Sequence, residues 1–93
     1  MLDIQTLALN AARQAIGPEA IRDVRIESTL DALDRPAYQF IYLIDRARTD
    51  VEPGMTSIKL RIALLDALEA NQDSHTPIVG ILDQQDWDRT LRA

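Results

Sequence analysis

The chain has 93 residues, no cysteine and a formal net charge of −5 at pH 7. This length suits one small domain, and the hydrophobic fraction of 46% argues against disorder. The absence of cysteine excludes disulfides, thiolate metal sites and cysteine nucleophiles. The sequence has no apolar run of about 20 residues that could cross a membrane, and its start lacks the pattern of a signal peptide. We therefore expect a cytoplasmic protein with no membrane contact.

The acidic balance argues against nucleic acid as a partner, because neutralising phosphates requires clustered lysine and arginine. The basic side chains are instead scattered among acidic ones, as on a solvated surface of mixed charge. Their only local concentration is formed by Arg46, Arg48, Lys59 and Arg61.

A first helix is expected over residues 4–16. Asp3 is a suitable N-cap, because its carboxylate can accept from free amides of the first turn. Gly17 and Pro18 end the helix, since glycine suits the cap and proline cannot continue it. The apolar residues with helical spacing are Ile4, Leu7, Ala8, Ala11 and Ala15.

Two apolar stretches, Val24–Leu30 and Tyr38–Ile44, predict strands over about residues 23–30 and 37–46. The turn-forming residues Asp31, Asp34 and Pro36 join them, which favours an antiparallel hairpin. The first stretch alternates between apolar and polar residues. The second is apolar on both faces, so it is expected to be central or to be covered by another element or chain.

A loop over Thr49–Gly54 precedes a second helix, predicted over residues 56–70. Its apolar stripe is expected to be Ile58, Ile62, Leu65 and Leu68, widened by Leu64 and Ala67. Pro77 then opens a short buried strand over residues 78–82. Asp83 begins a last helical turn or two that contains Trp87.

The predicted order is α-β-β-α-β-α, which indicates an α+β fold in one domain spanning residues 1–93. We expect a two-layer sandwich in which helices pack on one face of a three-stranded, mostly antiparallel sheet. In element order this resembles KH-type RNA-binding domains and the ribosome-binding-factor fold. The sequence departs from the KH pattern because it has no Gly-x-x-Gly loop. Its glycines are Gly17, Gly54 and Gly80.

No catalytic, metal or nucleotide motif stands out, so we expect no catalytic residues, no cofactor and no metal site. His75 is the single histidine, and with Asp73 it is read as part of a plain polar loop rather than as a ligand pair. Asp83 and Asp86 are read as helix-capping residues rather than as cation ligands.

The sequence favours a non-catalytic protein-interaction or accessory domain that acts as a homodimer or as an antitoxin-like partner of a basic protein. Aromatic and apolar residues of the second strand and the last helix supply large contact area. The candidate interface residues are Tyr38, Ile41, Tyr42, Leu43 and Trp87.

Two alternatives remain open at this point. One is an RNA-associated factor with the KH-like element order. The other is a small-ligand binder or an enzyme without a recognisable motif, whose pocket would lie between the sheet and the Thr49–Gly54 loop.

Overall fold

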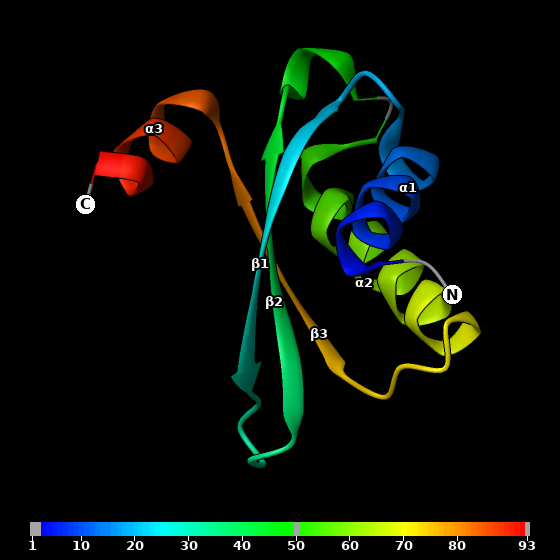
Figure 1. Cartoon of the computed structure of the whole chain (residues 1–93). Helices are drawn as coiled ribbons and strands as arrows, with labels where there is room; N and C mark the ends of the chain where they lie inside the picture. Colours follow the sequence, from blue (N-terminus) through cyan, green and yellow to red (C-terminus); the bar gives the residue numbers. More distant parts are fainter. Residues whose placement is uncertain (1–2, 50, 93) are drawn as a thin grey trace.

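The computed structural model describes residues 3–49 and 51–92 and shows an α+β fold with the predicted element order (Figure 1). Three helices and a short 3-10 helix, η1, accompany a three-stranded sheet. The elements are α1 Ile4–Ile16, β1 Ile21–Leu30, β2 Pro36–Ile44, η1 Arg46–Arg48, α2 Pro53–Ala70, β3 Thr76–Leu82 and α3 Gln84–Arg92.

β2 is the central strand, as its two apolar faces predict. It pairs antiparallel with β1, with Val24 opposite Tyr42, and parallel with β3, with Ile41 opposite Gly80. The sheet is therefore mixed rather than mostly antiparallel. The reason is that α2 carries the chain back along the sheet between β2 and β3, and such a crossover makes two neighbouring strands parallel.

The sequence led us to expect all helices on one face of the sheet, and the structure differs from this expectation. α1 and α2 cover one face, while α3 lies on the opposite side (Figure 1). α1 contacts β1 and α2 contacts β3, so the two helices lie side by side over opposite halves of the sheet. β1 and β3 are both edge strands.

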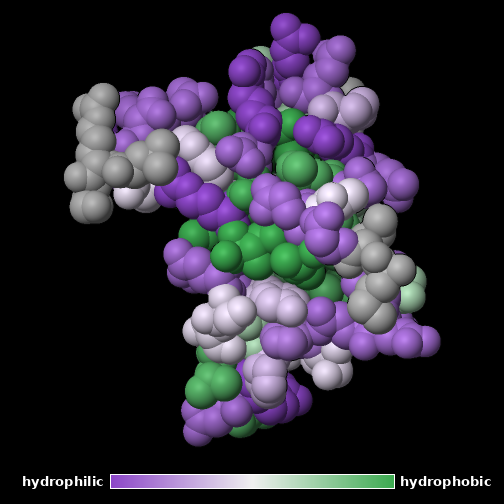
Figure 2. Space-filling model, in the orientation of Figure 1, coloured by the Kyte–Doolittle hydropathy of each residue, from purple (hydrophilic) through white to green (hydrophobic). Residues whose placement is uncertain are grey.

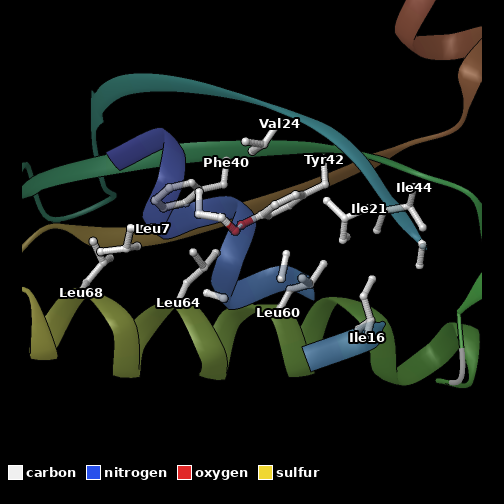
Figure 3. Packing of buried hydrophobic residues seen from close by; sticks show 14 residues of the cluster. Leu7, Ile16, Ile21, Val24, Phe40, Tyr42, Ile44, Leu60, Leu64 and Leu68 are labelled. Atoms are coloured by element: carbon white, nitrogen blue, oxygen red, sulfur yellow. Dashed lines mark hydrogen bonds between the residues drawn. The ribbon is translucent and has the colours of Figure 1, made fainter. Parts of the chain in front are cut away.

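The core lies between the sheet and the α1–α2 layer (Figure 3). At its centre Tyr42 is fully buried, and its hydroxyl donates a 2.9 Å hydrogen bond to the Ala8 carbonyl of α1. Burial raises the pKa of the Tyr42 hydroxyl well above its ordinary value, so it stays a donor. The other large, fully buried side chains are Phe40, Ile16, Leu60, Leu64 and Leu68.

The ends of α1 follow the sequence prediction. Asp3 accepts a 2.8 Å hydrogen bond from the Thr6 amide. Gly17 ends the helix with a φ of 111°, a left-handed backbone region that favours glycine. α2 begins at Pro53, three residues before its predicted start at Thr56, because proline is well suited to the first position of a helix.

The predicted apolar stripe of α2 is wrong in three of its four main positions. The side chains that face the core are Leu60, Leu64 and Leu68, each at most 2% exposed. Ile58, Ile62 and Leu65 are instead 49%, 54% and 45% exposed, respectively. Both sets have helical spacing, so periodicity alone could not decide which one faces the sheet.

The β1–β2 connection is held by Asp31. Its carboxylate accepts from the amides of Leu33 and Arg35 at 2.8 and 3.0 Å, and from the Arg35 guanidinium at 2.9 Å. The pKa of Asp31 lies below its usual value despite some desolvation. The main cause is the hydrogen bond from the Arg35 amide, followed by those from the Leu33 amide and the Arg35 guanidinium. The hairpin therefore has a defined turn. The length of this connection alone did not allow the strand register to be predicted from the sequence.

Truncating the core face of α2 should destabilise the fold. We expect Leu64→Ala to lower the free energy of unfolding by about 2–5 kcal/mol, because it leaves a cavity under Phe40 and Tyr42. Leu33→Ala, at a leucine that is 71% exposed in the β1–β2 connection, should cost less than about 0.5 kcal/mol. Urea unfolding of both variants measures the difference, and equal costs would contradict the assignment of the core face.

The Asp31 carboxylate should make stability depend on pH in the acid range. Its pKa is lowered in the folded state, so its contribution is present above the unfolded pKa of about 4 and is lost as pH falls through the folded value. We expect the stability difference between the wild type and Asp31→Asn to be full at neutral pH and to shrink below about pH 4. Urea unfolding over a pH series tests this, and a constant difference would refute it.

Candidate interaction surfaces

The outward side of α2 carries a row of apolar side chains, which we name the outer stripe. Its members are Met55, Ile58, Ile62 and Leu65, which are 41%, 49%, 54% and 45% exposed. They follow one another at intervals of three or four residues, so they share one face of the helix. α2 is thus apolar on its core face and on its outward face. A helix of that kind is typical of elements buried on all sides.

The outer stripe lies between two hollows. On the α1 side, an open groove of about 740 Å³ runs between the helices and is bordered by Ile62, Lys59 and Asp66. On the β3 side, Leu65 and Glu69 border a hollow that also contains His75, just before β3. The stripe therefore extends from the groove between the helices to the edge of the sheet.

Four exposed charged residues flank the outer stripe. Lys59 and Arg61 stand in the N-terminal half of α2, and Asp66 and Glu69 stand in its C-terminal half. Within residues 3–49 and 51–92, none of the four belongs to an ion pair. Several arginines elsewhere do, as in the pairs Arg22–Asp45 at 3.1 Å, Arg35–Asp31 at 2.9 Å and Arg48–Glu19 at 2.9 Å.

The second surface is the face of the sheet that α1 and α2 leave open. α3 covers one end of this face, where Leu43 and Trp87 are each 6% exposed. The Arg25 guanidinium of β1 lies 3.8 Å from the centroid of the Trp87 ring and donates to the Trp87 carbonyl at 3.3 Å. It also donates to the Thr90 hydroxyl. These contacts hold α3 against the sheet by a cation–π interaction and hydrogen bonds.

The rest of the open face is only partly covered. Ile41 is half-buried there, and Ile78 of β3 is 37% exposed. Figure 2 shows that α3 and the far end of the β1–β2 hairpin project beyond the body of the molecule. A band of apolar side chains crosses the middle of the same view. At the end of the hairpin, Leu30 and Leu33 are 58% and 71% exposed.

The structure separates the five residues that the sequence nominated for an interface. Tyr42 lies wholly inside the core, so it offers no surface to another chain in this fold. Leu43 and Trp87 are covered within the chain by the packing of α3. Tyr38 is half-buried and stacks on His75, with ring centroids 3.9 Å apart. Ile41 keeps part of its side chain at the surface.

Sequence reasoning missed the outer stripe as a surface, because it placed Ile58, Ile62 and Leu65 in the core. A signal was present in the sequence. α2 contains more apolar residues than one face can hold, and a helix that is apolar on more than one side needs a second covering element.

Asp73, His75 and Tyr38 form a small polar cluster at the start of β3. The His75 ring nitrogen Nδ1 lies 2.6 Å from the Asp73 carboxylate, which also accepts from the His75 amide at 3.0 Å. Desolvation raises the pKa of Asp73, but the hydrogen bonds and charge of His75, aided by Tyr38, outweigh it and leave the pKa lowered. The pKa of Tyr38 is raised, mainly by desolvation and further by the charge and hydrogen bond of Asp73. In the described part of the chain, no three acidic, histidine or cysteine residues are grouped to hold a metal ion.

A hollow does occur near the position where the sequence placed a possible ligand pocket. Its volume is about 240 Å³, below the range of roughly 300–1,000 Å³ typical of ligand pockets. The Thr49 hydroxyl donates to the Ile16 carbonyl and the Thr56 hydroxyl to the Glu52 carbonyl, each at 3.3 Å. Both hydroxyl hydrogens are therefore engaged with the backbone rather than directed at a ligand.

Comparisons with protein-family models, with curated proteins and with solved structures find no match to this chain. Among its described residues, no helix is long and apolar enough to span a bilayer.

Trp87 should be the main anchor of α3. We expect Trp87→Ala to lower the free energy of unfolding by about 3 kcal/mol, since it removes a buried aromatic side chain and the partner of Arg25. Gln85→Ala, at an exposed residue of the same helix, is the matched control and should cost less than about 0.5 kcal/mol. Thermal or urea unfolding measures both, and a Trp87→Ala variant as stable as the control would contradict this anchoring.

Proposed function

We propose that this protein is a non-catalytic protein-interaction domain that binds its partner through the outer stripe of α2. The observation that carries the proposal is the exposure of Ile58 and Ile62, each about half exposed on a helix whose opposite face is fully buried. Exposed apolar side chains are common singly, but a contiguous row with a polar rim is typical of protein-binding surfaces.

The extent of exposed surface supports the proposal. The chain exposes 5996 Å², whereas a compact monomer of its mass exposes about 5,400 Å². Part of the difference reflects the projecting hairpin and α3 (Figure 1). A chain of 93 residues can bury only a small hydrophobic core. Covering its exposed apolar side chains with another protein is therefore favourable.

The charges favour a protein partner over nucleic acid. Of the four cations that form the local basic concentration, Arg48 lies in an ion pair with Glu19. Lys59 and Arg61 are two residues apart on α2 and therefore point to different sides of a helix that also carries Asp66 and Glu69. Phosphate binding requires a continuous basic surface. The mixed charges around an apolar centre are instead the usual pattern of a protein interface with a polar rim.

The test is a comparison of two apolar-to-acidic changes at exposed positions. Ile62→Asp introduces a charge at the centre of the outer stripe, while Leu33→Asp introduces the same charge at the end of the hairpin. We expect Ile62→Asp to weaken association by more than about tenfold, because binding would bury an unpaired carboxylate. Light scattering coupled to gel filtration measures self-association, and titration with a purified recovered partner measures hetero-association.

Leu33→Asp should leave either form of association unchanged, and circular dichroism should show that both variants are folded. The proposal fails if the wild type associates with no protein. It also fails if Ile62→Asp associates as tightly as the wild type.

A further inference from the structure

We propose that the occupant of the outer stripe is a second copy of this chain, docked about a twofold axis with the two α2 helices antiparallel. This inference rests on the proposed function and names its partner. It is carried by the distribution of charge along α2.

The charge distribution is self-complementary. Lys59 and Asp66 are seven residues apart, about two helical turns, so they lie on the same flank of the stripe. Both border the groove between α1 and α2. A twofold axis that passes between Ile62 and Ala63 places Lys59 of each copy opposite Asp66 of the other, because the two positions are equidistant from it. Two such pairs would form in each dimer.

The same charges disfavour a parallel arrangement. Two parallel α2 helices at equal height would set the flank of one copy that carries Lys59 against the flank of the other that carries Arg61. Like charges in contact across an interface cost several kcal/mol in specificity, so the pattern selects the antiparallel pairing.

Lys59 and Asp66 do not form ion pairs within α2. Lys59 and Asp66 are too far apart to pair along the helix, where ion pairs join positions three or four residues apart. Glu69 stands in the last turn of α2, where the helix dipole favours cations, and no basic residue is present in that turn. An antiparallel neighbour would bring the positive half of its own α2 to this end.

Charge reversal tests the pairing directly. Lys59→Asp makes this flank acidic throughout and Asp66→Lys makes it basic throughout, so each variant alone should self-associate at least about tenfold more weakly than the wild type. An equimolar mixture of the two should form a heterodimer, and the chain carrying both changes should regain self-association. Arg46→Asp, at an exposed residue of η1, changes the net charge equally and should leave the dimer intact.

Sedimentation equilibrium with one variant carrying a tag resolves the homodimers and the heterodimer, with the wild type at twice the chain mass of 10.5 kDa. A monomeric wild type, or single variants that dimerise as tightly as the wild type, would overturn the proposal. So would a mixture that stays monomeric. A monomer that binds a different protein through Ile62 would overturn the twofold pairing alone and leave the proposed function standing.

Discussion

The structure depends on one strand that is apolar on both faces. In β2, Phe40 and Tyr42 point to one side of the sheet, and Ile41 and Leu43 point to the other. A strand of this kind must be central and must be covered twice. α1 and α2 supply the first cover, with the Tyr42 hydroxyl bonded to α1 at its centre (Figure 3). α3 supplies part of the second, and Arg25 holds it there through the Trp87 ring.

The outer stripe of α2 follows from the same architecture. A three-stranded sheet has room for two helices on one face, and within residues 3–49 and 51–92 no further helix covers α2 from outside. α2 also forms the crossover between the parallel strands β2 and β3, so it lies over the half of the sheet that ends in a free edge. Its exposed apolar residues therefore lie over the half of the sheet that contains β3.

Much of the fold could be predicted from the sequence, because local signals were strong. The cap at Asp3, the glycine at position 17 and the alternation in β1 are short-range features whose physical meaning does not depend on tertiary contacts. The parallel pairing of β3 was missed, although a helix placed between two neighbouring strands is the signal for it.

The proposed binding surface was harder to predict. On α2, the residues Ile58 and Ile62 and the residues Leu60 and Leu64 each form an apolar row with helical spacing. Only the packing against β2 shows which row is inside. The position of α3 also depended on tertiary contacts, because the Arg25–Trp87 contact joins residues 62 positions apart. Sequence reasoning identified the need for a further cover on β2, which α3 meets in part, and it missed the exposed apolar row on α2.

The central claim is that two copies of the chain meet along the outer stripe, and the absence of cysteine from the sequence allows a direct measurement. A cysteine introduced by Ile62→Cys would lie close to the proposed twofold axis and therefore close to its own counterpart. We predict that mild oxidation links this variant into a covalent dimer much faster than Leu33→Cys, in which the cysteine is exposed at the end of the hairpin. Equal rates of cross-linking for the two variants would contradict the claim.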